Sequence, residues 1–172
     1  MIDHIRPALA TLGLMTVLTG LAYPLALTGL GQTLMPHQAN ASLIVRDGQV
    51  IGSALVGQAF AAPGYLHPRP SAVDYDAAAA GASNMGPTSA ALIADQAARA
   101  VDFVASTGAA SVPVDAVTAS GSGLDPHVSP ENARAQAGRI AAARGVPQAR
   151  VAALIEAQVE PRWLGLFGEP RV

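Results

Sequence analysis

Near its N-terminus the chain carries an apolar run long enough to cross a lipid bilayer. No Asp, Glu, Lys or Arg occurs between Arg6 and Arg46, and the 24 residues from Pro7 to Leu30 are predominantly apolar. As an α-helix this run extends about 36 Å, whereas the hydrocarbon core of a membrane is about 30 Å thick. The pattern therefore predicts one membrane-spanning helix. Pro24 removes one backbone hydrogen bond and should bend that helix, which neighbouring helices tolerate in a membrane.

Two stripes of different side-chain size run along the predicted helix. One stripe contains small residues and the proline, namely Gly13, Thr16, Gly20 and Pro24. The other contains leucines, namely Leu14, Leu18, Leu21 and Leu25. Small residues allow a second helix to approach closely, whereas leucines suit contact with lipid tails. We therefore predict that Gly13, Thr16 and Gly20 face a partner helix. The alternative is that these glycines reflect only the general frequency of glycine in membrane helices.

A cleavable signal peptide is the alternative to a retained anchor. The segment Ala39-Asn40-Ala41 has the small-x-small form of a cleavage site, but the apolar run exceeds the ~7–15 residues of a signal peptide's hydrophobic region. A retained anchor is therefore favoured. The predicted division is a short cytoplasmic N-terminus at residues 1–6, the membrane helix and its exit at residues 7–35, and an extracytoplasmic domain at residues 36–172.

The residues after the apolar run predict a β-hairpin followed by a long loop. Residues from Ser42 to Val45 and from Gln49 to Val56 are rich in strand formers, and Asp47-Gly48 between them is a hairpin turn signal. The segment from Phe60 to Pro87 is rich in Pro, Gly, Ala and Ser, which indicates an extended loop. Loops of this length inside a compact domain are usually functional or mobile.

The C-terminal half predicts three helices and a strand. One helix starts at Thr88 or Ser89 and runs to about Ser106, with an apolar face made by Leu92, Ile93, Ala97, Val101 and Val104. A second is capped by Ser129, begins at Pro130 and stops at Gly145, and a third covers 148–158. Residues 112–118 alternate apolar and polar side chains like a half-buried strand. The predicted fold class is therefore α+β, a short sheet with about three helices after a single transmembrane helix.

Composition and charge narrow the possible functions. Only 13% of the residues are charged, about half the usual fraction, and all ten basic residues are arginines scattered along the chain. No basic stripe is present that could neutralise phosphates, so a nucleic-acid partner is not expected. The chain has no cysteine, which excludes disulfides and thiolate chemistry. Neither His67 nor His127 has a second ligand at helical spacing, so no metal site is predicted.

One segment contains the residue types of a hydrolytic triad. Ser120, Asp125 and His127 lie close together in the sequence, within a glycine-rich stretch. Closeness in sequence does not supply triad geometry, and no Gly-x-Ser-x-Gly elbow is present. The glycine-rich stretch also lacks the lysine of a phosphate-binding loop, so a turn that needs positive φ is the favoured interpretation. A membrane-anchored extracytoplasmic hydrolase stays open as the alternative function.

Several segments in a fixed order resemble the C subunit of bacterial Kdp-type potassium-transporting ATPases. The longest runs from Val117 to Pro130, and the others are 6–7, 20–24, 38–44, 52–58, 67–71, 83–87 and 168–172. They are spread in one order over nearly the whole chain, which makes the resemblance far more specific than any single motif. Two departures are Ala82, where the family usually has a second glycine, and the missing apolar tail after Val172.

The resemblance implies a four-part pump in the bacterial cytoplasmic (inner) membrane. Its other members are a channel-like potassium-translocating subunit, a P-type ATP-hydrolysing subunit and a small one-helix subunit. The family's C subunit is described as non-catalytic and as a chaperone that raises ATP affinity, and the matching nucleotide-binding residue here is Gln136. The residues that we expect to dock partners are Gly13, Thr16, Gly20, His67, Arg69, Asn84, Ser120, Gly121, Asp125 and His127.

Overall fold

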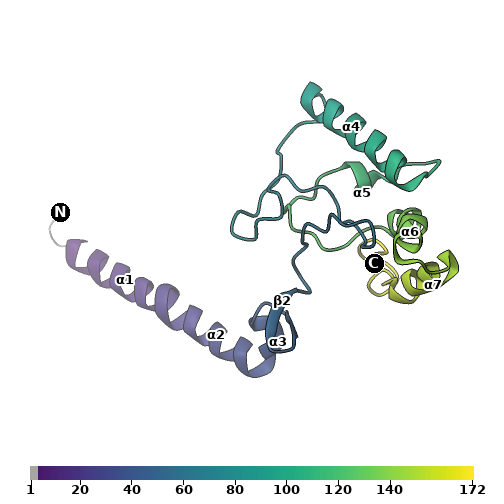
Figure 1. Cartoon of the computed structure of the whole chain (residues 1–172). Helices are drawn as coiled ribbons and strands as arrows, with labels where there is room; N and C mark the ends of the chain where they lie inside the picture. Colours follow the sequence, from purple (N-terminus) through teal and green to yellow (C-terminus); the bar gives the residue numbers. More distant parts are fainter. Residues whose placement is uncertain (1–3) are drawn as a thin grey trace. The chain divides into compact units, whose positions relative to one another are not determined.

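The computed structural model describes residues 4–172 and divides them into two compact units, residues up to Ser53 and residues Ala54–Val172 (Figure 1). Residues 1–3, part of the predicted cytoplasmic N-terminus, lie outside the described residues. The predicted hairpin falls in the first unit, together with the apolar helix. The boundary after residue 35 was drawn from membrane topology and stays a prediction.

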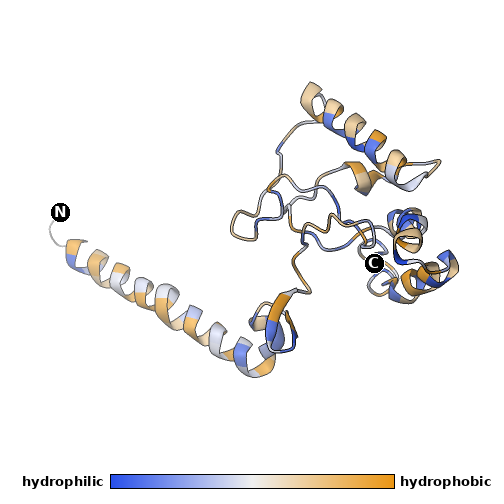
Figure 2. Ribbon diagram, viewed as in Figure 1, coloured by the Kyte–Doolittle hydropathy of each residue, from blue (hydrophilic) through white to orange (hydrophobic). Residues whose placement is uncertain are grey.

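The first unit is built on one long apolar helix. It comprises α1 (Ile5–Val17), a π-helical segment (Leu18–Ala22) and α2 (Tyr23–Leu34). Within residues 4–172, Ile5–Leu34 is the single helix whose length and composition suffice to cross a bilayer. In Figure 2 most of its length has the colour of apolar residues. The predicted apolar helix is confirmed, with ends a few residues outside the apolar run at 7–30.

Backbone groups near Pro24 are satisfied by a widened turn and by hydroxyl groups. Pro24 has no N–H to donate to the carbonyl of Gly20, and the Tyr23 N–H donates to the carbonyl of Leu18, as in a π-helix. The hydroxyl of Thr28 donates to the carbonyl of Pro24 at 2.8 Å, and that of Thr19 to the carbonyl of Met15 at 2.7 Å. Such internal bonding suits a lipid environment, where water is not available as a partner.

The predicted hairpin is confirmed. After a short helix α3 (Pro36–Ala39), strand β1 (Leu43–Arg46) pairs antiparallel with β2 (Gln49–Ser53). Asp47 and Gly48 form the turn with φ of 52° and 77°, and two positive values in succession are typical of a type I′ turn. The second strand ends at Ser53, three residues earlier than predicted.

The second unit contains the predicted helices and the long loop. Its helices are α4 (Ala90–Thr107), α5 (Val114–Val117), α6 (Pro130–Arg144) and α7 (Gln148–Gln158). The hydroxyl oxygens of Ser89 and Ser129 accept N-cap hydrogen bonds from the backbone of α4 and α6 as predicted. Gly145, with φ of 63°, ends α6. No helix or multi-residue strand forms between Ser53 and Ala90, which confirms the extended loop at 60–87.

The strand predicted at residues 112–118 is wrong. The central four residues form the short helix α5, preceded by Pro113 in extended conformation. The alternation of side chains was real, but no neighbouring strand is present in the second unit to pair with it. The turn is instead fixed by Asp115, whose carboxylate bonds the N-terminus of α6.

A small core lies between α6 and α7. Its buried members are Val128, Ala133, Ala137, Ile140, Ala141, Val151 and Ile155, with Leu66, Val146 and Val172 packed against them. Alanines allow the two helices to approach closely. The chain end joins this core, because Val128 and Val172 exchange two backbone hydrogen bonds of 3.2 and 3.0 Å.

The amphipathic helix α4 turns its apolar stripe away from the domain. Ile93 and Val101 are 58% and 68% exposed, whereas Arg99 and Phe103 on the other side are half-buried. Arg99 donates to the carbonyl of Val117 in α5 at 3.1 Å. This polar contact holds the face of α4 that carries Arg99 and Phe103 against the domain. The apolar face with Ile93 and Val101 is therefore exposed at the surface.

Candidate functional site

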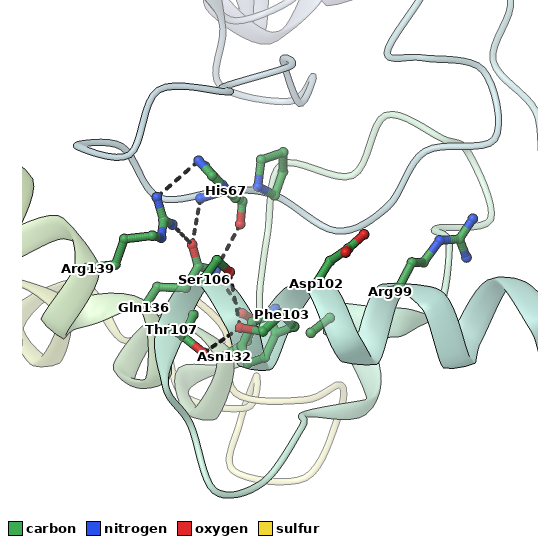
Figure 3. Close-up of a pocket in the computed structure, with 11 residues that line it drawn as sticks. His67, Arg99, Asp102, Phe103, Ser106, Thr107, Asn132, Gln136 and Arg139 are labelled. Atoms are coloured by element: carbon green, nitrogen blue, oxygen red, sulfur yellow. Dashed lines mark hydrogen bonds between the residues drawn. The ribbon is translucent and has the colours of Figure 1, made fainter.

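Gln136 is the centre of a buried hydrogen-bond network between α6 and the long loop. Its side-chain oxygen accepts from the backbone N–H of His67 at 2.8 Å, and its side-chain nitrogen donates to the carbonyl of His67 at 3.1 Å. The same nitrogen donates to Asn132 Oδ1 at 2.8 Å. The side chain therefore pairs with the backbone of His67 much as a neighbouring strand would (Figure 3).

Two arginines of α6 complete this clamp on the loop. Arg139 donates to the carbonyls of Pro63 and Tyr65 at 2.8 and 3.2 Å, and to Gln136 Oε1 at 2.5 Å. Arg144 donates to the carbonyl of Gly64 at 2.5 Å. Guanidinium groups thus satisfy loop carbonyls that have no strand partner. Residues 63–67 are held on α6 by side chains rather than by regular secondary structure.

A cavity of about 350 Å³ opens beside Gln136. Gln136, Arg139 and His67 line one part of it, and Arg99 and Asp102 of α4 another (Figure 3). The two guanidinium groups give it cationic character that Asp102 partly offsets. The amide of Gln136 already uses both acceptor positions and both donor hydrogens, so a ligand that bonds to it must first displace His67, Asn132 or Arg139.

His67 is held in its neutral form. Burial lowers the pKa of its imidazole, and the nearby positive charge of Arg139 lowers it further, although a contact with the Ala62 carbonyl acts in the opposite direction. Arg139 Nη1 lies 3.1 Å from His67 Nε2 and can donate only when that nitrogen carries no proton. The same nitrogen lies 3.2 Å from the Ala62 carbonyl, which it can bond only when protonated. His67 therefore has two mutually exclusive arrangements.

Asp115 joins α5 to the start of α6. Its carboxylate accepts from the backbone N–H of Ser129 at 2.7 Å, the Ser129 hydroxyl at 2.8 Å and Asn132 Nδ2 at 3.1 Å. A carboxylate at this position also interacts favourably with the helix dipole. Asn132 then bonds Gln136, so one network runs from α5 to residues of the long loop.

The glycine-rich segment after α5 is packed into the domain. Ser120 is 3% exposed, and its N–H donates to the carbonyl of Pro70 at 3.0 Å. Gly123 has φ of 70°, and a Cβ there would lie 2.9 Å from the Gly81 carbonyl. The predicted turn with positive φ is present at Gly123, whereas Gly121 is exposed and lies outside the residues with positive φ.

Arg69, Asp125 and His127 come together at the end of this segment. Asp125 accepts from Arg69 at 3.3 Å and lies 3.2 Å from His127 Nδ1. The buried hydroxyl of Ser120 has no hydrogen-bond partner within the described residues, so it is not paired with His127. The three residue types of a hydrolytic triad are therefore neighbours in sequence without the nucleophile–base bond of a triad.

A groove of about 810 Å³ lies over the Arg69–Asp125–His127 cluster. Its other walls come from the start of α6 and from the C-terminal segment, and include Glu131, Arg134 and Arg171. Charges of both signs alternate around it. Three of the ten residues that we expected to dock partners, Arg69, Asp125 and His127, line this groove.

The remaining predicted docking residues are dispersed. Gly13, Thr16 and Gly20 lie on the exposed apolar helix of the first unit, where nothing lies within 4 Å of a Cβ built at either glycine. Asn84 is exposed in the long loop with φ of 53°. Within residues 4–172, no group of three or more His, Asp or Glu side chains could hold a metal ion.

Sequence reasoning missed Asp115 and Arg139, the two residues that organise the network. Neither belongs to a motif: Asp115 lies in the segment predicted as a strand, and Arg139 lies in the helix predicted between Pro130 and Gly145. A signal was available for Arg139, which follows Gln136 by three residues and therefore lies on the same helix face.

Comparison with known proteins identifies the family. A family model described as KdpC, the c chain of the K+-transporting ATPase, matches residues 5–172. The potassium-transporting ATPase KdpC subunit of Cereibacter sphaeroides is 64% identical over 172 residues, covering 100% of this chain and 92% of the relative. Those of Caulobacter vibrioides and Rhodospirillum rubrum are 57% and 53% identical, covering 100% of this chain and 89% and 91% of theirs. The chain therefore belongs to the KdpC family of potassium-transporting ATPase subunits.

Proposed function

We propose that this chain is a non-catalytic accessory subunit of an ATP-driven potassium uptake pump. The single observation that carries the proposal is the family match, which extends from residue 5 to residue 172. The expected partners are the channel-like potassium-translocating subunit, the P-type ATP-hydrolysing subunit and the small one-helix subunit. The buried, unpaired hydroxyl of Ser120 supports a non-catalytic role over the alternative of a hydrolase.

The proposed location is the bacterial cytoplasmic membrane. Ile5–Leu34 supplies a helix of sufficient length, and its exposed glycines offer a surface for a partner helix. The bulk of the chain is proposed to lie outside the cytoplasm, with Arg6 on the cytoplasmic side, where basic residues close to a membrane helix are favoured.

The groove over Arg69, Asp125 and His127 is the proposed docking site of the second unit. Charged side chains of both signs and prolines line the groove. Its volume of about 810 Å³ is sufficient to hold side chains of a partner. Asp125 is held by Arg69 on one side and by His127 on the other, so its charge has a fixed position. A fixed charge pattern provides specificity in protein–protein contacts.

Co-purification of groove variants with the ATP-hydrolysing subunit tests this docking site. His127→Ala and Glu131→Arg change the groove without touching the core, and we expect both to lower recovery of the partner. Arg150→Ala removes an exposed arginine of α7 outside the groove and serves as the matched control. Equal recovery of all three variants would remove the groove from the proposal without affecting membership of the complex.

Nucleotide contact at Gln136 is the second candidate and an alternative to the extracytoplasmic location, because it needs the second unit to meet ATP; the neighbouring cavity, which Arg99 and Arg139 line, supports it. It requires that His67, Asn132 or Arg139 leave Gln136, because the amide has no free hydrogen-bonding position. A photoreactive ATP analogue should then label the second unit of the purified complex, and Gln136→Ala should reduce the labelling while Arg150→Ala does not. Labelling that is unchanged in Gln136→Ala contradicts this candidate.

A further inference from the structure

A tight turn near the C-terminus presents four large apolar side chains to solvent. Trp163, Leu164, Leu166 and Phe167 are between 60% and 75% exposed. None of them lines either of the two cavities described above. We call residues 163–167 the Trp163–Phe167 turn. A contiguous group of exposed aromatic and aliphatic side chains marks a site of interaction.

The turn is ordered, so its exposed side chains have fixed positions. Trp163 and Phe167 exchange backbone hydrogen bonds of 2.9 and 3.0 Å, and their rings lie 5.8 Å apart. Leu164 has φ of 52°, a conformation that costs a leucine on the order of 1 kcal/mol or more. This strain places the Leu164 side chain outward at the tip instead of against the domain.

Paired charges surround the base of the turn. Arg162 bonds Glu169 at 3.1 Å, and Arg171 bonds Glu160 at 2.8 Å. Two cations and two anions leave this collar without net charge. A neutral, polar collar below an apolar tip matches the depth profile of a membrane interface, where tryptophan is enriched at the level of the headgroups.

The chain also keeps the second unit close to a bilayer. Leu34 ends the apolar helix, and Leu43 pairs with Ser53 just before the second unit begins, so Leu34 and Leu43 are only nine positions apart. Nine residues span at most about 30 Å when fully extended. A compact unit of this size has a radius of gyration of about 14 Å. The tether is therefore short enough for surface residues of the second unit to reach the lipid.

We propose that the Trp163–Phe167 turn inserts into the interfacial layer of the bilayer that holds the Ile5–Leu34 helix. The partner is the lipid surface itself, recognised by burial of the two leucines and the two aromatic rings rather than by a specific headgroup. This second attachment would restrict rotation of the second unit about its tether. It rests on the proposed membrane location of Ile5–Leu34, but neither on the proposed docking groove nor on the pump's other subunits.

Trp163 is the single tryptophan of the chain, so its fluorescence reports on the turn directly. The intact chain is reconstituted alone into phosphatidylcholine vesicles, with ordinary lipid or with lipid brominated near the headgroup end of the acyl chains. We expect blue-shifted emission in ordinary lipid and a marked loss of fluorescence in brominated lipid. Leu164→Ser combined with Leu166→Ser should abolish most of that loss. Leu154→Ser, which changes an equally exposed leucine of α7, should leave it intact.

If the turn binds something other than lipid, the fluorescence results differ. Equal fluorescence in ordinary and brominated lipid overturns the proposal, whatever the emission wavelength. A blue shift that depends on chain concentration would assign the turn to a second copy, and one that requires the other pump subunits would assign it to a protein partner.

Discussion

At the scale of single residues, the glycine at position 57 controls how the glycine-rich segment packs. The Gly57 N–H donates to the carbonyl of Leu124 at 2.7 Å, and a Cβ at this position would lie 2.9 Å from the backbone oxygen of Asp125. Backbone cannot move aside as a flexible side chain can. The close approach therefore excludes every side chain larger than hydrogen.

Gly57→Ala should consequently destabilise the second unit by about 1–3 kcal/mol, the usual cost of overpacking. Thermal unfolding of the purified chain measures the effect. Gly86→Ala is the matched control, because nothing lies within 4 Å of a Cβ there and its change should be small. Equal melting temperatures for the two variants would contradict the described packing of residues 119–127.

His67 makes the stability of the loop clamp dependent on pH. Its pKa is lowered in the folded chain, mainly by burial, so the unfolded chain binds a proton more readily. The stabilisation is therefore fully present above the ordinary pKa of about 6.5 and is lost as the pH falls from there through the folded pKa.

We expect the melting temperature of the wild-type chain to fall more steeply between pH 7.5 and about pH 5 than that of His67→Gln. Glutamine cannot take up a proton, so the difference between the two pH profiles reports the contribution of the His67 imidazole. Parallel pH profiles for the two proteins would show that His67 is not held in its neutral form.

At the scale of whole elements, local signals were sufficient where the element is determined locally. Ser89 and Ser129 start their helices, Gly145 ends one, and Asp47-Gly48 makes the hairpin turn, because each acts within a few residues. The helix-end and turn predictions were therefore confirmed.

Elements determined by distant contacts were not predictable. Residues 112–118 alternate like a strand, but α5 forms because Asp115 bonds the start of α6, fourteen residues away. Helix α4 carries an apolar stripe that pattern reasoning assigns to a core, whereas Arg99 and its contact with Val117 hold the opposite face inward. The clamp of Arg139 on residues 63–67 likewise joins segments more than 70 positions apart.

The membrane helix permits a test of its two stripes. Gly13→Leu and Gly20→Leu should reduce recovery of the ATP-hydrolysing subunit in co-purification, because a leucine keeps a partner helix from approaching closely. Leu14→Ala and Leu18→Ala should have smaller effects, since these positions are predicted to face lipid. If all four variants recover the partner equally, the assignment of the stripes is wrong.

At the scale of the whole molecule, the chain combines an apolar helix with a domain whose polar network is mostly structural. Gln136, Arg139 and Asp115 have their hydrogen bonds to the protein itself, and Ser120 is buried without a base beside it. Many of the polar side chains that could take part in chemistry are therefore used to hold a loop-rich domain together. This distribution supports the proposed role as an accessory subunit.

The blocks that carry the resemblance span nearly the whole chain in one order, so the family could be identified from the sequence, whereas the groove and the clamp could not. The groove depends on the meeting of Arg69 with Asp125, 56 positions apart, and on the return of the C-terminal segment to Val128. Neither pairing leaves a periodic signal. The position of Gln136 was known from the resemblance, but its saturation by His67 and Arg139 required the structure.

Purification of the tagged, intact chain from membranes of cells that produce the whole potassium-transporting ATPase tests the central claim most directly. We predict that the channel-like and P-type subunits elute with it in a fixed ratio, and that the chain purified alone hydrolyses neither ATP nor model esters. Elution of the chain without those subunits, together with hydrolytic activity that Ser120→Ala removes, would contradict the account.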